Sequence, residues 1–215
     1  MSGAFYVLDR AVRKLGGSAC LYRYVLVAQP VRQTPLLGPR RGRSIEVRQV
    51  DPDDPALGAM PLSPEVLRFR FGQGAVCFGA FQDGAMIGCL WLCLGPYEED
   101  EVRCRFTPLP AGRASWDFDV YVLPELRTGL AFARLWDAAN RHLRERGVAW
   151  SFSRISAFNP LSLASHARLG AQRVGTATYL RVGRWQVMTS SLPPRFHVST
   201  GPQAVPRISL RVPEV

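Results

Sequence analysis

The change of hydrophobic period between residues 114 and 156 constrains the fold more than any other feature of this sequence. The segment "ASWDFDVYVLP" alternates as a strand does and ends at Pro124. Residues 129–147 then place apolar side chains at helical spacing and finish with arginines and a glycine, as helix C-termini do. "VAWSFSRIS" has the composition of a second strand. A strand, a long helix and another strand in direct succession indicate a sheet covered by helices, not an all-β or all-α domain.

The residues before this unit predict further strands. "SIEVRQV" alternates, and "AVCFGAFQDG" followed by "AMIGCLWLCLG" predicts a hairpin with Asp83-Gly84 as its turn. "PLSPEVLRFRFGQG" has room for a short helix. We therefore expect an α+β fold, with a mixed, mostly antiparallel central sheet flanked by helices.

Three parts are expected along the chain. Residues 1–43 form an N-terminal appendage of one helix and one strand, followed by a linker rich in Pro, Gly and Arg. Residues 44–190 form the main domain. Residues 191–215 form a Pro-rich tail that has no clear period and is expected to pack loosely.

Composition bears on partners and compartment. The formal net charge of +10 favours anionic ligands, but the basic residues are scattered and only Lys14 is a lysine, so we do not expect nucleic-acid binding. No apolar run reaches the roughly 18 residues of a membrane span, and no signal peptide is evident. The five cysteines form no C-x-x-C pair. We expect a cytoplasmic protein without disulfides or a metal.

The segment "NPLSLASHARLG" predicts a short helix. Asn159 can cap it, Pro160 suits its first position, and Leu169-Gly170 ends it. The helix carries one of only three histidines, His166. This residue is either a structural histidine or a functional one.

The turn "LRTGLA" between the strand and the long helix is a candidate anion site. Gly129 and Ala131 are small, so a phosphate can approach the backbone N–H groups at the positive end of the helix dipole. Arg127 can add a cation. Small residues at such turns are common, so this pattern alone does not identify a function.

Together these segments resemble the GNAT superfamily of N-acetyltransferases over about residues 44–185. That family has Gln/Arg-x-x-Gly-x-Gly/Ala after its fourth strand; Gly129 and Ala131 match, and Leu126 departs from the pattern. It also has an Asn, then a Tyr seven residues later, then Leu-Gly and an aromatic residue. Here Asn159 and Leu169-Gly170 match, while His166 holds the Tyr position and Ala171 the aromatic position.

The resemblance implies the GNAT acyl-CoA N-acyltransferase fold and transfer of an acetyl or other acyl group from acyl-CoA to an amine acceptor, either a small molecule or a peptide. The cofactor would lie between the strands "DFDVYV" and "WSFSRI". It implies cofactor contacts from Val120, Tyr121, Val122, Arg127, Thr128, Gly129, Leu130, Ala131, Asn159 and Ser162. His166 would protonate the departing thiolate with a pKa nearer to neutral than that of tyrosine.

The base stays open. Alternation places Asp117, Asp119 and Tyr121 on one face of the strand and Trp116 and Phe118 on the other. Asp119, Glu101 in the acidic run "YEEDE", or an ordered water are candidates, and the acidic residues can instead recognise a cationic acceptor.

Three other functions remain as alternatives. The first is a catalytically impaired acyl-CoA-binding regulator or scaffold. The second is a nucleic-acid-binding module driven by the net charge. The third is an acyltransferase that uses long-chain or carrier-protein thioesters, with residues 1–43 shaping the acyl channel. A homodimer is one open assembly state.

Overall fold

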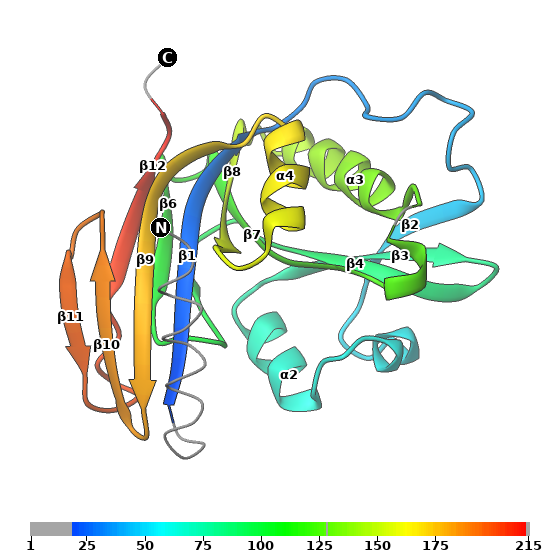
Figure 1. The fold of residues 1–215 in the computed structure, drawn as a ribbon. Helices are drawn as coiled ribbons and strands as arrows, with labels where there is room; N and C mark the ends of the chain where they lie inside the picture. The colour runs from blue at the N-terminus through cyan, green and yellow to red at the C-terminus, as the bar shows by residue number, and fades with distance from the viewer. Residues whose placement is uncertain (1–18, 128, 214–215) are drawn as a thin grey trace.

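A computed structural model describes residues 19–127 and 129–213. Its centre is a nine-stranded sheet (Figure 1). In spatial order the strands are β11 (Phe196–Ser199), β10 (Trp185–Ser190), β9 (Gln172–Val182), β1 (Ala19–Pro30), β8 (Trp150–Ser156), β7 (Ala114–Val122), β4 (Ala85–Cys93), β3 (Val76–Gln82) and β2 (Ile45–Val50). The pairings are antiparallel except for β7 with β8. The expected mixed, mostly antiparallel sheet is confirmed.

Helices cover both faces of this sheet. The helices are α2 (Pro64–Gly72), α3 (Ala131–Glu145) and α4 (Pro160–Arg168), with short 3-10 turns η1 (Pro55–Ala59) and η2 (Pro124–Leu126). We call the side that carries α3 and α4 the helix face. These two helices touch there, because the His166 ring of α4 lies 5.7 Å from the Trp136 ring of α3. On the opposite face, Phe71 of α2 packs edge-on against Trp91 of β4.

A second, three-stranded sheet covers the rest of the opposite face. It consists of β12 (Arg207–Arg211), β6 (Arg105–Leu109) and β5 (Tyr97–Glu98). Phe106 of β6 stacks on Trp116 of β7 with 4.4 Å between the ring centroids. Stacked aromatic rings of this kind bury a large apolar area and fix the small sheet against the large one.

The sequence expectation for residues 1–43 needs correction. Their strand, β1, is not part of an appendage: it lies inside the sheet between β8 and β9 (Figure 1). Tyr24, Leu26 and Ala28 of this strand are buried in the core. A strand this apolar is buried best in the middle of a sheet, with a neighbouring strand on each side. The helix expected before β1 falls outside the described residues.

The expectation of a loosely packed tail is also wrong. β11 pairs with β10, and β12 pairs in parallel with β6. Ile208 and Leu210 of β12 are fully buried. Their alternation with exposed arginines and a serine is a strand pattern, which the prolines of the tail obscured.

Candidate functional site

The two parallel strands at the centre of the sheet diverge. β7 and β8 pair from Ala114–Trp150 to Asp117–Ser153 and no further. Both strands continue beyond this point, β7 to Val122 and β8 to Ser156. Beyond the Asp117–Ser153 pair the two strands no longer pair with each other, and a backbone edge that is not paired can hydrogen-bond to an extended ligand as to an extra strand.

A bulge in β7 sits directly after this point. The pairing of β4 with β7 shifts register between Cys89 and Trp91, and Asp119 has a φ of 51°. A bulge of one residue reverses which face the following side chains occupy.

This bulge corrects the face assignment drawn from simple alternation. Asp119 bonds to Arg70, whose guanidinium lies over the Trp91 and Phe118 rings on the face opposite α3 and α4. Asp117 bonds to Ser151. Ser151 pairs in register with Gln29, which contacts His166 of α4. Asp117 thus lies on the helix face, apart from Asp119.

The N-terminus of α3 follows the open end of β7. Its N-cap residue, Leu130, makes no side-chain capping hydrogen bond. Gly129 donates its N–H to the carbonyl of Leu126, and a Cβ added at Gly129 would lie 3.1 Å from that carbonyl oxygen. Thr128 lies outside the described residues. The first backbone N–H groups of a helix that has no side-chain cap can bind an anion, and a glycine just before the helix leaves room for it.

Arg127 supplies a cation beside this helix start. Its Nε donates a hydrogen bond to the Val122 carbonyl, and its guanidinium lies 5.8 Å from the Tyr121 ring centroid. The structure therefore brings together the predicted residues at 120–122, Arg127 and the start of α3.

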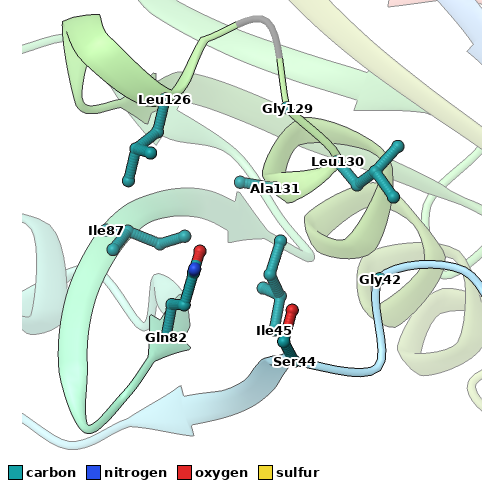
Figure 2. A pocket seen from close by; sticks show the side chains of 9 residues that line it. All are labelled: Gly42, Ser44, Ile45, Gln82, Ile87, Leu126, Gly129, Leu130 and Ala131. Carbon is teal, nitrogen blue, oxygen red and sulfur yellow. The ribbon is translucent and has the colours of Figure 1, made fainter.

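A pocket of about 220 Å³ borders the same turn. Figure 2 shows Gly129 and Ala131 on one side of it and Ile45, Gln82 and Ile87 on the other. Its lining comes from β3, β4, β2 with the residues just before it, the turn and the first residue of α3, with no residue of β8 or α4. The pocket is therefore adjacent to the α3 N-terminus but distinct from the opening between β7 and β8.

His166 lies between α4 and α3. Its ring packs edge-on against Phe132 and Trp136, and Nδ1 is 3.2 Å from the Gln29 amide oxygen. The side chain is 5% exposed, and this burial lowers the pKa of His166 to about 4. The predicted role of His166 as proton donor depended on a pKa near neutral. The pKa in this buried position is lower than that. At neutral pH His166 is an uncharged imidazole.

We expect this burial to make folding sensitive to acid. The unfolded chain binds a proton on His166 below its ordinary pKa, whereas the folded chain resists until about pH 4. The free energy of unfolding should therefore fall between pH 7 and pH 4, by up to about 3 kcal/mol from this residue. Urea unfolding of wild type and His166→Gln at both pH values measures the difference. An equal loss of unfolding free energy in the two proteins would show that His166 is not the source of the acid sensitivity.

Asn159 and Ser162 lie at the start of α4. The Asn159 side chain accepts a hydrogen bond from the Ser162 backbone N–H at 3.0 Å, which confirms the predicted N-cap. Gly170 after the helix has a φ of 88°, as its predicted stop requires. Cofactor contact by Asn159 or Ser162 stays a prediction.

The acidic run lies across the open strands on the face opposite α3 and α4. Asp100 of this run bonds to Arg70 at 2.7 Å, and Arg70 also bonds to Asp119 of β7 at 2.6 Å. Glu99 and Glu101 both form ion pairs with Arg154 of β8, at 2.7 Å and 3.0 Å. The loop from Glu99 to Glu101 is thus tied to β8 through Arg154 and, by way of Arg70 of α2, to Asp119 of β7. Asp119 and Glu101, the predicted catalytic carboxylates, are each engaged by an arginine.

Sequence reasoning missed Arg70 and Arg154, which organise this loop. Arg70 lies two residues after Arg68, and Arg154 is the one arginine of the segment "VAWSFSRIS", so no local pattern marks either side chain as buried. Their structural signature is burial, since the Arg70 and Arg154 side chains are 5% and 17% exposed.

Two negative findings apply to the described residues. Within ranges 19–127 and 129–213, no helix is long and apolar enough to cross a membrane. In the same part of the chain, no group of three or more His, Cys, Asp or Glu side chains has the arrangement of a metal site.

Comparisons with known proteins match the fold. No protein-family model and no curated protein sequence matches the chain. Among solved structures, a Drosophila protein matches with a TM-score of 0.53 and 16% identity over 83% of this chain and 57% of the other. A putative GNAT-family acetyltransferase from Novosphingobium aromaticivorans matches with a TM-score of 0.50 and 16% identity over 76% and 66%.

A tandem GNAT protein from the clavulanic acid biosynthesis pathway matches with a TM-score of 0.53 and 18% identity, over 80% of this chain and 58% of the other. This chain thus spans less than two thirds of the length of each of these three structures. Two of the three are described as GNAT proteins, and the expected strand–helix–strand unit is present. The chain therefore has the fold of the GNAT acetyltransferases.

Proposed function

We propose that this protein transfers an acyl group, most simply acetyl, from acyl-CoA to the amine of a small molecule or peptide. One observation carries the proposal: the parallel strands β7 and β8 separate after the Asp117–Ser153 pair, and β7 leads into an α3 N-terminus without a side-chain cap. This geometry offers a backbone edge for an extended thioester and an anion site at the end of that edge.

The residues present fit an acyl-CoA. The diphosphate would lie on the backbone of residues 127–131, where Gly129 has no side chain to exclude it. The pantetheine would run along residues 120–122 of β7, hydrogen-bonding to the open edge. Backbone N–H groups there would polarise the thioester carbonyl and stabilise the oxyanion that forms when the amine attacks.

The acceptor would approach from the face that carries Asp119 and Glu101. These carboxylates are partly exposed, with side chains 36% and 43% accessible. They favour an acceptor that carries positive charge near its reacting amine. Both carboxylates form ion pairs with arginines. We therefore assign them to recognition of the acceptor rather than to removal of its proton.

The second candidate function is acyl-CoA binding without catalysis. The burial of His166, which lowers its pKa to about 4, favours this alternative because the residue at the family's proton-donor position is not in its protonated, cationic form near neutral pH. Acyl-CoA-dependent thiol release over a panel of amines, measured after CoA binding is established, separates the two functions.

Calorimetric titration with CoA tests the binding site itself. Gly129→Phe should weaken CoA binding about a hundredfold, because its side chain removes charge-assisted hydrogen bonds from the phosphate position. Gly58→Phe controls for an added exposed ring, since Gly58 is exposed and a Cβ there meets nothing within 4 Å, whereas a Cβ at Gly129 also lies 3.1 Å from the Leu126 carbonyl oxygen. Unchanged affinity in Gly129→Phe would remove the phosphate site from residues 127–131.

A further inference from the structure

Asp117 lies where the pairing between β7 and β8 ends. It pairs with Ser153 in the last register before β7 and β8 separate. If the diphosphate lies beyond the C-terminal end of β7, the pantetheine runs back along this strand toward Asp117. The sulfur end of the cofactor is then the end nearest to Asp117.

The carboxyl group of Asp117 is buried and only half satisfied. The residue is 1% exposed, and Oδ1 accepts a hydrogen bond from the Ser151 hydroxyl at 2.6 Å. Oδ2 and the buried Ser153 hydroxyl have no well-directed hydrogen-bond partner, although the two groups are close enough for the hydroxyl to lower the pKa of the carboxyl. A buried polar atom without a well-directed partner can bond to a ligand group that reaches it.

Burial also brings the pKa of the Asp117 carboxyl close to neutral pH. It raises the pKa of Asp117 to about 7, while the hydroxyls of Ser151 and Ser153 act in the opposite direction. The Ser153 hydroxyl lies near enough to stabilise the anion but makes no well-directed hydrogen bond. Both protonation states of Asp117 are therefore populated at neutral pH.

Other titratable side chains lie on the same face as Asp117. His166 of α4 stays uncharged above about pH 4, and burial lowers the pKa of His142 of α3 as well. Asp137 of α3 is engaged by the backbone N–H groups of Leu36 and Leu37. The strand residues beside Asp117 on this face are uncharged: Gln29 of β1, Ser151 and Ser153 of β8, and Ser115 of β7.

We propose that Asp117, rather than His166, exchanges a proton with the sulfur of coenzyme A. The inference rests on the proposed function and deepens it. As the amine nitrogen bonds to the thioester carbon, the C–S bond breaks and its electron pair stays on sulfur. The Asp117 carboxylic acid gives its proton to that thiolate. The resulting carboxylate is protonated again by the proton that the amine releases, so amine and thioester become amide and thiol.

Binding of CoA and of desulfo-CoA, which lacks the thiol, tests this without knowledge of the acceptor. In wild type, ionised Asp117 accepts a hydrogen bond from the thiol of bound CoA. The ratio of CoA affinity to desulfo-CoA affinity should therefore rise about five- to tenfold between pH 6 and pH 8, with a midpoint near 7. In Asp117→Asn the ratio should be flat. Calorimetry at several pH values measures both ligands.

Ser151→Ala separates this role from a structural one. It removes the hydrogen bond to Oδ1 and leaves Oδ2 unchanged, so its affinity ratio should still depend on pH. A flat ratio in wild type, or a ratio that keeps its pH dependence in Asp117→Asn, would overturn the proposal. Failure of both ligands to bind wild type would instead refute the proposed function. If Asp117→Asn does not fold, the wild-type midpoint still decides, since a ratio that does not change near pH 7 overturns the proposal.

Discussion

Replacing Arg154 with methionine is expected to lower the free energy of unfolding by about 3–5 kcal/mol. Arg154 bonds to Glu99, whose side chain is fully buried, and to Glu101, and its guanidinium lies 4.6 Å from the Tyr24 ring centroid. Without the arginine, a buried carboxylate loses its counter-charge. The loss is much larger than that of an exposed ion pair, which contributes at most about 1 kcal/mol.

The deficit should depend on pH in a defined direction. Burial raises the pKa of Glu99 above its usual value, and Arg154 opposes that rise. In Arg154→Met the folded chain therefore holds a proton on Glu99 that the unfolded chain releases, so the free energy of unfolding falls as the pH increases. Urea unfolding at pH 5 and pH 8 should show the larger deficit at pH 8.

Two further variants make the Arg154 prediction specific. Glu99→Gln combined with Arg154→Met removes both charges and should recover part of the lost free energy. Arg68→Met is the matched control, because Arg68 and its partner Glu65 are both largely exposed. A deficit in Arg154→Met no larger than that in Arg68→Met would show that the pair makes no net contribution to stability.

Trp136→Ala is expected to cost about 3–5 kcal/mol of unfolding free energy. Trp136 is fully buried between α3 and the sheet, and its ring contacts both Phe132 and His166. Its removal leaves a cavity and uncovers the imidazole. The pKa of His166 should therefore rise from about 4 toward its ordinary value, which an NMR titration of the ring protons measures.

Trp185→Ala is the control for Trp136→Ala. Trp185 lies on β10 and is 46% exposed, so its replacement should cost much less. Trp136→Phe should fall between the two, because the smaller ring keeps part of the contact. Similar unfolding curves for Trp136→Ala and Trp185→Ala would mean that α3 does not pack on the sheet through this side chain.

Local patterns predicted the strand–helix–strand unit well. The helical spacing from Leu130 to Leu143 and the cap at Asn159 depend on neighbouring residues, so they are visible in sequence. The Asp83-Gly84 hairpin is confirmed for the same reason, with positive φ at both turn residues. The position of β1 was not predictable, because its partners lie more than a hundred residues away.

Only the part of the candidate site that is formed by backbone groups could be predicted from the sequence. The turn at Gly129 follows from residue size and order, and the structure brings it together with Arg127 and Tyr121. Side-chain chemistry was harder. The bulge at Asp119 turns that side chain to the face opposite Asp117, and burial gave His166 and Asp117 pKa values that no local pattern encodes.

The interior position of β1 also bears on how the chain is made. Tyr24 pairs with Ser156, and Tyr22 pairs with Tyr179, so this strand leaves the ribosome long before either neighbour exists. At about 5–20 residues per second, the delay before both neighbours have been synthesised is on the order of 10–30 s. During that time an apolar strand has no native partner. Nascent chains of this protein should therefore recruit chaperones at their N-terminal end, and slower translation should lengthen that exposure.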